Sequence, residues 1–228
     1  MCTTLPVPAL ARWSSLYAHT DPLAPRRSQL IRHRGPDGSG INLIENEDGT
    51  CSAIAHERLA IMDPLAGNQP LYSNDRKLSL AINGEIYNHK ELRAEVGDES
   101  RFRTHSDCEP VVHLYEQVGH EVASKLDGDF AFVIVDEVTG ELYAARDPIG
   151  VNSLYWGTGL DGSKWFASEA KPLVRGGCVN IEMFPPGHYY SSRDDKLVRY
   201  YNPKWYDVQA AQAPIDLPAL RCAPVGEH

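Results

Sequence analysis

Alternation of apolar and polar residues predicts a strand in the first half of the chain. Leu78, Leu80 and Ile82 stand at every second position of a segment that begins at Lys77. A period of two is typical of a half-buried strand. The predicted strand runs directly into Asn83-Gly84-Glu85, so we expect these three residues at its carboxyl end.

Two apolar runs in the second half of the chain predict a β-hairpin. Residues 130–135 and 141–146 flank the turn-like sequence Val138-Thr139-Gly140. Because the first run is apolar at consecutive positions, we expect it in the middle of a sheet that is covered on both faces. Residues 165–168 and 188–192 are two further strand candidates.

Residues 106–122 have the pattern of an amphipathic helix. Ser106 or Asp107 can cap it, and Pro110 falls in its first turn, where proline is tolerated. The apolar positions that follow a helical period are Val111, Leu114, Tyr115, Val118 and Val122. Shorter helices are predicted for residues 26–31 and 90–95.

The order of these elements favours an α+β sandwich over an alternating, doubly wound sheet. Residues 1–25 contain prolines at positions 6 and 8, which predict irregular structure. Residues 26–206 form the predicted main domain. Residues 207–228 are rich in alanine and proline, and we expect a linker or the truncated start of a second domain.

Charge and composition exclude several function classes. The 228 residues contain 22 basic and 31 acidic side chains, a net charge of −9, which argues against a broad nucleic-acid-binding face. No apolar run reaches the roughly 18–20 residues of a membrane-spanning helix. Five scattered cysteines without a CxxC pair predict reduced thiols in the cytoplasm. Because the nine histidines form no HxH or HExxH pair, we expect no metal site.

Cys2 is the candidate nucleophile, since it becomes the first residue if the initiator methionine is removed. A thiolate attacks carbonyl carbons and needs a base to form at neutral pH. The free α-amine of an amino-terminal cysteine can supply that base, because its pKa of about 7.7–8.0 suits proton transfer near neutrality. On its position alone, a cysteine after methionine is usually an accident of sequence.

Five further residues complete a candidate site. The amide of Asn83 and the backbone N–H of Gly84 can form an oxyanion hole, although Asn-Gly is also a common turn dipeptide. Arg58 offers a planar fork for a carboxylate. Glu85 and Asp107 could hold an ammonium group, while Asp107 has the alternative role of a helix cap. Together these groups predict hydrolysis of the side-chain amide of a free amino acid, either glutamine or asparagine.

The same region resembles the amino-terminal, class II glutamine amidotransferase domain of the glutamine-hydrolysing asparagine synthetases. The resemblance runs from about Ser28 to Tyr206. The stretches that carry it are Arg32-His33-Arg34-Gly35-Pro36-Asp37, Arg58-Leu59-Ala60-Ile61, Asn83-Gly84-Glu85-Ile86-Tyr87-Asn88-His89, Ser106-Asp107-Cys108-Glu109, Leu126-Asp127-Gly128-Asp129-Phe130-Ala131-Phe132, Arg146-Asp147-Pro148-Ile149-Gly150 and Ala167-Ser168-Glu169-Ala170-Lys171.

The resemblance implies an amino-terminal nucleophile hydrolase fold, two antiparallel sheets between helices, and hydrolysis of L-glutamine through a Cys2 thioester. Asn83 and Gly84 would form the oxyanion hole, and Glu85 with Asp107 would bind the substrate ammonium. The substrate carboxylate would bind Arg58, helped by the backbone of Leu59, Ala60, Ile61 and Met62. It implies no cofactor in this chain, because ATP and magnesium belong to the synthetase domain. The expected partners are L-glutamine and a synthetase domain or subunit; a homodimer is left open.

Two departures from the family pattern leave an alternative open. Thr3-Thr4-Leu5-Pro6 follows Cys2 where the family has a short apolar strand, so residues 1–25 are a divergent segment that carries the nucleophile. The chain also contains no Ser-Gly-Gly-x-Asp loop for ATP, as expected of a fragment. The alternative is a catalytically impaired or truncated amidotransferase-like module that binds glutamine without turnover; a hydrolase acting on a different amide is a weaker third interpretation.

Overall fold

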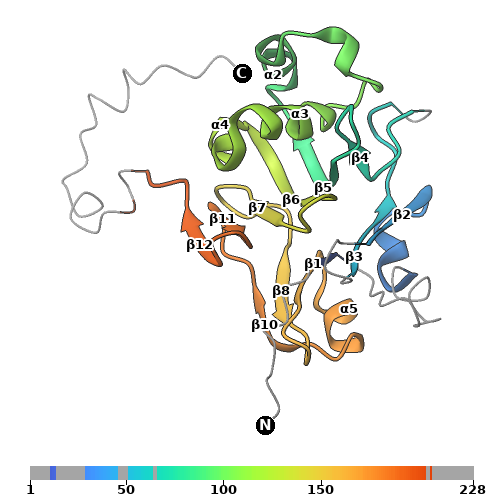
Figure 1. The fold of residues 1–228 in the computed structure, drawn as a ribbon, viewed down its shortest axis with the longest axis vertical. Helices are drawn as coiled ribbons and strands as arrows, with labels where there is room; N and C mark the ends of the chain where they lie inside the picture. Colours follow the sequence, from blue (N-terminus) through green and yellow to red (C-terminus); the bar gives the residue numbers. More distant parts are fainter. Residues whose placement is uncertain (1–10, 14–28, 46–50, 64–65, 204–205, 207–228) are drawn as a thin grey trace, which may run out of the picture.

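The computed structural model describes residues 11–13, 29–45, 51–63, 66–203 and 206 (Figure 1). Two six-stranded sheets pack face to face, and helices cover both outer faces. The resulting order of layers is helix, sheet, sheet, helix, which is the predicted α+β sandwich.

The first sheet has the strand order β10-β8-β9-β1-β3-β2. Its strands are β1 (Ala11–Trp13), β2 (Gly38–Glu45), β3 (Cys51–Arg58), β8 (Tyr155–Thr158), β9 (Lys164–Ala167) and β10 (Val179–Met183). All pairings are antiparallel except those of β1, which runs parallel to both β3 and β9. The prediction of irregular structure for residues 1–25 is therefore wrong for the three described residues of β1.

The second sheet is antiparallel throughout and has the order β12-β11-β7-β6-β5-β4. Its strands are β4 (Leu71–Tyr72), β5 (Leu78–Ile86), β6 (Gly128–Asp136), β7 (Leu142–Arg146), β11 (His188–Ser191) and β12 (Lys196–Arg199). The predicted strand before Asn83 and the predicted hairpin are confirmed as β5 and as β6 with β7. As expected from its apolar run, β6 lies in the middle of the sheet, and Phe130 to Val135 are buried.

Helices α2 (His89–Val96), α3 (Glu109–Val118) and α4 (Val122–Lys125) cover the outer face of the second sheet (Figure 1). Helix α5 (Ala170–Arg175) packs on the first sheet through Leu173, beside Trp165 and Ala167. Three short 3₁₀ helices, η1 (Gln29–Arg34), η2 (Glu99–Arg101) and η3 (Gly119–Glu121), join these elements. Between the sheets, Ile54 and Phe166 meet Ala81 and Val133 in one apolar layer.

Three details of the predicted helices need correction. The helix expected over residues 106–122 ends at Val118, because Gly119 has a φ of 58°, and Val122 begins the separate α4. Its amino-terminal cap is Cys108 without a side-chain cap hydrogen bond, so neither Ser106 nor Asp107 caps it. The described part of the helix expected at 26–31 is the 3₁₀ helix η1, which continues to Arg34.

Candidate functional site

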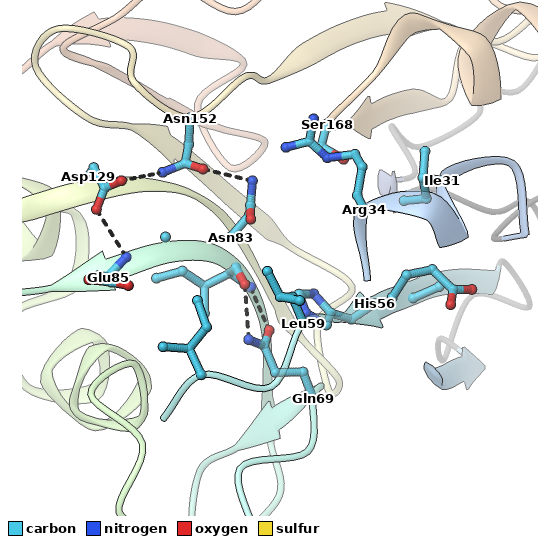
Figure 2. A pocket seen from close by; sticks show the side chains of 15 residues that line it. Ile31, Arg34, His56, Leu59, Gln69, Asn83, Glu85, Asp129, Asn152 and Ser168 are labelled. Carbon is cyan, nitrogen blue, oxygen red and sulfur yellow. Dashed lines mark hydrogen bonds between the residues drawn. The ribbon is translucent and has the colours of Figure 1, made fainter. Parts of the chain in front are cut away.

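A cleft of about 370 Å³ opens where the carboxyl ends of β3 and β9 approach the end of β5 (Figure 2). Its volume lies within the range of small-molecule sites. Polar groups from several elements converge on it: Arg34, His56, Gln69, Asn83, Asp129 and Asn152. Leu59 and Ile61 form an apolar part of the wall, and both side chains are more than half exposed.

Asn83 and Gly84 line the cleft at the carboxyl end of β5, as the sequence predicts. Gly84 has a φ of 142°, and a Cβ atom there would lie 1.9 Å from the carbonyl oxygen of Asp129 on β6. Any side chain would therefore push the two central strands apart. Glycine at this position lets β5 and β6 approach this closely and stay paired beside the cleft.

The side chain of Asn83 is held by a chain of two hydrogen bonds, visible in Figure 2. Its Nδ2 donates to Oδ1 of Asn152 at 2.8 Å, and Nδ2 of Asn152 donates to Oδ2 of Asp129 at 3.2 Å. Oδ1 of Asp129 accepts from the backbone N–H of Glu85 at 3.3 Å and from the hydroxyl of Tyr87 at 3.1 Å. The chain links β5, the start of β6 and the turn after β7.

The turn that carries Asn152 is wrapped around two buried charged residues. Nε of Arg146 donates to the carbonyl oxygen of Asn152 at 2.7 Å. The carboxylate of Asp147 accepts backbone N–H bonds from Ile149, Gly150 and Val151, and from Asn152 at 3.2 Å. Because Arg146 and Asp147 are at most 4% exposed, these bonds fix the backbone from which the Asn152 side chain projects.

Glu85 and Asp107 are both near the end of β5, but their surroundings differ. The Glu85 side chain is exposed, whereas Asp107 is 6% exposed and accepts a 2.8 Å bond from the backbone N–H of Ile86. Burial, then the charge of and a hydrogen bond to Asp107, and more weakly the charge of Glu85, raise the pKa of the buried Cys108 thiol. Both carboxylates thus lie near Cys108, but only Glu85 is among the residues that line the cleft. The binding of a substrate ammonium by Glu85 and Asp107 stays a prediction.

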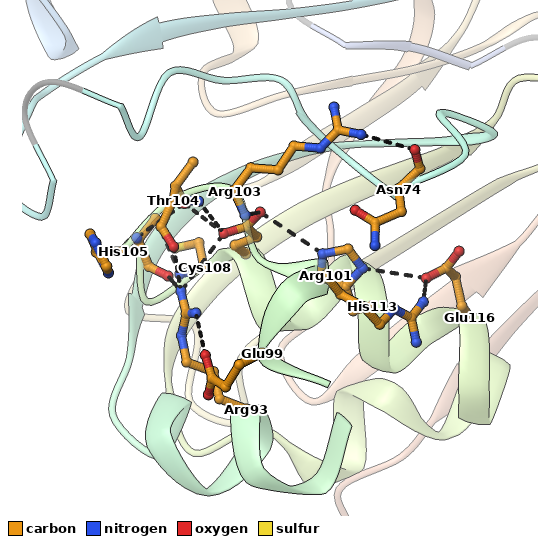
Figure 3. A network of polar contacts seen from close by, with 12 residues as sticks. Asn74, Arg93, Glu99, Arg101, Arg103, Thr104, His105, Cys108, His113 and Glu116 are labelled. Atoms are coloured by element: carbon orange, nitrogen blue, oxygen red, sulfur yellow. Dashed lines mark hydrogen bonds and ion pairs between the residues drawn. The ribbon is translucent and has the colours of Figure 1, made fainter. Parts of the chain in front are cut away.

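A polar network behind Asp107 holds the loop that precedes α3 (Figure 3). Glu109 is 2% exposed and accepts from the backbone N–H groups of Arg103 and Thr104, each at 2.8 Å. Arg93 donates to the carbonyl oxygens of Thr104 and Ser106 at 2.8 and 3.1 Å. This network fixes the backbone immediately before Asp107.

Arg58 is 7% exposed and braces the loop that follows β3. Its guanidinium donates to Oδ1 of Asn68 at 2.9 Å and to the carbonyl oxygens of Met62 and Asp63 at 3.3 and 2.7 Å. Gly67 leaves room for this contact, because a Cβ there would lie 2.9 Å from Nη2. A carboxylate-binding role for Arg58 stays a prediction.

The segment expected to assist Arg58 is also partly engaged within the protein. The backbone N–H of Ala60 donates to Oδ2 of Asp37 at 2.9 Å. Met62 is 43% exposed, and its carbonyl oxygen accepts from Arg58. Leu59 and Ile61 line the cleft. The predicted substrate contacts of this segment therefore stay a prediction as well.

His56 lines the cleft from β3. Burial, and next the positive charge of Arg58, lower the pKa of its imidazole from 6.5 to about 4. The ring is consequently neutral at pH 7 and contributes no positive charge to the cleft wall.

Cys2, the predicted nucleophile, lies outside the described residues. Among the described cysteines, Cys108 and Cys178 form no disulfide. Cys108 is the thiol beside the cleft residues, with Sγ 3.7 Å from the carbonyl oxygen of Gly84. Because burial raises its pKa, it has the properties of a structural thiol and lacks those of a nucleophile.

Sequence reasoning missed Asn152, Asp129 and Gln69 as residues of the site. Gln69 bonds both backbone groups of Ile82, at 2.8 and 3.0 Å, and so extends the edge of the second sheet into the cleft. Asn152 and Asp129 lie in or beside the two motifs Arg146–Gly150 and Leu126–Phe132, so the motifs were the available signal.

In the part of the chain that the structure describes, no group of three or more His, Cys, Asp or Glu side chains could hold a metal ion. None of the helices in these ranges is long and apolar enough to cross a membrane.

Comparison with protein families gives a match over most of the chain. The glutamine amidotransferase domain family matches residues 9–186. The chain is 50% identical over 196 residues to an asparagine synthetase (glutamine-hydrolysing) of Arabidopsis thaliana, covering 86% of this chain and 33% of that protein. It is 47% identical over 196 residues to a protein of the same name from Triphysaria versicolor, with 86% and 32% coverage. The chain thus spans about a third of the length of these relatives.

Solved structures share the fold. The glutamine phosphoribosylpyrophosphate amidotransferase of B. subtilis superposes with a TM-score of 0.63 at 25% identity, covering 79% of this chain and 47% of that one. A structure described as the allosteric regulatory enzyme of purine biosynthesis gives a TM-score of 0.62 at 26% identity, covering 76% and 45%.

Proposed function

Because the chain belongs to the glutamine amidotransferase domain family, we propose that it hydrolyses L-glutamine to glutamate and ammonia. The observation that carries the proposal is the donor pair Asn83 and Gly84 in the cleft wall, with Glu85 and the buried Asp107 close by. A carboxamide placed at the donor pair would have its amino acid ammonium near the two carboxylates. Arg58 and the segment from Leu59 to Met62 are the proposed partners of its carboxylate.

In the proposed reaction, the α-amine of Cys2 takes the thiol proton and the sulfur attacks the side-chain carbonyl carbon of glutamine. The oxygen becomes an oxyanion that accepts hydrogen bonds from Nδ2 of Asn83 and the backbone N–H of Gly84. The protonated α-amine then gives its proton to the leaving nitrogen, and ammonia departs as the thioester forms. Water, deprotonated by the same amine, attacks the thioester and releases glutamate with the free thiol.

The relatives suggest where the ammonia goes. Their names describe glutamine-hydrolysing asparagine synthetases, and this chain matches about a third of each. We propose that the ammonia supplies a synthetase domain or subunit, which would bring ATP and magnesium. The scattered cysteines support a cytoplasmic location for this reaction.

The test is to incubate the full chain with L-glutamine and measure glutamate and ammonia separately. We expect the two products in equal amounts, a much slower reaction with L-asparagine, and loss of both products in Cys2→Ala. Tight binding of glutamine by the unaltered chain without release of ammonia would contradict the proposal.

A further inference from the structure

The hydrogen-bond chain behind Asn83 determines which side-chain atoms donate and which accept. Asp129 is its fixed end, because an ionised carboxylate accepts hydrogen bonds and cannot donate them. Two groups that are not part of this hydrogen-bond chain also donate to the Asp129 carboxylate: the backbone N–H of Glu85 and the hydroxyl of Tyr87. The third, from Asn152, must then be a donor too.

This requirement sets the direction of every following bond. Asn152 turns Nδ2 toward Asp129, at 3.2 Å, and therefore presents Oδ1 to Asn83, at 2.8 Å. An amide oxygen only accepts, so Asn83 must present its nitrogen to Asn152. An asparagine amide can otherwise rotate by half a turn and exchange its oxygen and nitrogen at little cost in shape.

The backbone of Asn152 is held in place independently of the orientation of its side-chain amide. Its carbonyl oxygen is bound by Arg146 at 2.7 Å and its N–H by Asp147 at 3.2 Å, both from buried side chains. The side-chain amide is thus carried at a fixed place between Asn83 and Asp129, and the remaining freedom is which of its two polar atoms faces which neighbour.

We propose that Asp129 and Asn152 are positioning residues that fix the amide of Asn83 with its nitrogen as the oxyanion donor. The inference rests on the proposed hydrolysis of glutamine. With the nitrogen fixed, one N–H bonds Asn152 and the second is the donor to the oxyanion. In the opposite orientation, the amide oxygen of Asn83 would replace that nitrogen and repel the developing negative charge.

The inference predicts an unusual pattern of loss and rescue. In Asp129→Asn, the new amide keeps its oxygen toward Glu85 and Tyr87 and turns its nitrogen toward Asn152. Asn152 and Asn83 then both reverse, although the number of hydrogen bonds is unchanged. The double variant Asp129→Asn with Asn152→Asp places an acceptor-only carboxylate beside Asn83, which restores the original orientation of its amide.

The experiment measures kcat and KM for glutamine in the full-length variants. We expect Asp129→Asn to lower kcat at least about tenfold, toward the 10²–10³-fold cost of losing one oxyanion donor, with KM within about threefold. The double variant should recover kcat to within about threefold of the unaltered protein. Asp127→Asn, an exposed carboxylate two positions earlier, is the matched control and should change neither constant by more than about threefold.

The inference is wrong if Asp129→Asn is as active as the unaltered chain, or if the double variant is no better than Asp129→Asn. A second measurement does not depend on turnover or on the folding of a variant. Neutron diffraction from the unaltered protein should show deuterium on the Asn83 atom that faces Asn152, and none on the Asn152 atom that faces Asn83. The reverse arrangement would overturn the inference even if glutamine hydrolysis is confirmed. If hydrolysis fails, the expected arrangement would still show that Asp129 and Asn152 fix the orientation of the Asn83 amide.

Discussion

Asn83 donates a 2.8 Å hydrogen bond to the side-chain oxygen of Asn152, a residue 69 positions later in the chain. The contact joins the carboxyl end of β5 to the turn after β7 at the wall of the cleft. It makes the orientation of one side-chain amide depend on segments that are far apart in the sequence. The proposed chemistry depends on that orientation.

Substitution of Asn83 should affect the reaction more than substrate binding. In Asn83→Ala the side-chain donor of the proposed oxyanion hole is absent, and we expect kcat to fall by about 10²–10³-fold. KM should change by less than about fivefold, because the donor is used mainly in the transition state. Steady-state kinetics with L-glutamine measure both constants. A rise in KM at constant kcat would instead assign Asn83 to ground-state binding.

Gly84→Ala should disrupt the centre of the second sheet. Its φ of 142° and the 1.9 Å approach of a Cβ to Asp129 predict a loss of at least about 2 kcal/mol in the free energy of unfolding. Gly162→Ala is the control, since Gly162 has a φ of 84° but no atom within 4 Å of its Cβ position. Strain alone should cost that control about 1 kcal/mol. Urea unfolding compares the two, and equal losses would contradict the role of the close approach.

Removing the charge of Glu85 should weaken substrate binding without a change in stability. Glu85 is exposed, so Glu85→Gln should alter the free energy of unfolding by less than about 0.5 kcal/mol. If Glu85 faces the substrate ammonium, KM for glutamine should rise about tenfold, the cost of roughly 1.4 kcal/mol of lost attraction. Glu91→Gln, an exposed glutamate of α2, should leave KM unchanged. Similar effects of both substitutions would argue for a general effect of charge.

His56 should make the fold sensitive to mild acid. In the folded protein the pKa of His56 is lowered from 6.5 to about 4. As the pH falls below 6.5, His56 is therefore protonated in the unfolded chain, whereas in the folded protein it stays neutral until about pH 4. The stability contributed by the neutral ring is complete above pH 6.5 and decreases as the pH falls toward 4, by at most about 3 kcal/mol. In His56→Gln, the free energy of unfolding should therefore fall less between pH 7 and pH 4.5. An equal fall in the unaltered protein and in His56→Gln would contradict a neutral imidazole in the folded state. Replacement of the exposed His105 by glutamine is the control.

Much of the fold follows from local pattern. The alternation before Asn83 and the apolar run of β6 predict two central strands. A strand buried on one face has apolar residues at alternate positions, and a strand buried on both faces has them at consecutive positions. The helix boundaries are less predictable. Asp107 looks like a cap in the sequence, but its carboxylate bonds the N–H of Ile86 on another element. An aspartate can serve as a helix cap or as an acceptor for a distant backbone N–H of the same chain, and the sequence alone does not distinguish these two roles.

The candidate site is only partly predictable for the same reason. Asn83, Gly84 and Glu85 are consecutive on one strand, so their convergence follows from the strand itself. Asn152 and Asp129 reach Asn83 through the pairing of β5 with β6 and through the turn held by Arg146. Their role depends on tertiary contacts that no short-range pattern encodes. The brace that Arg58 forms with Asn68 is hidden from the sequence in the same way.

Formation of the glutamyl thioester at Cys2 can be observed by acid-quenched turnover followed by peptide mass spectrometry. The full chain is mixed with L-glutamine, stopped within the first turnover, digested, and searched for a glutamyl group on each cysteine-containing peptide. We expect the group on a peptide that begins with Cys2, with Met1 absent, and none on the peptides that contain Cys108 or Cys178. A glutamyl group on another cysteine, or turnover by a chain that retains Met1, would contradict it.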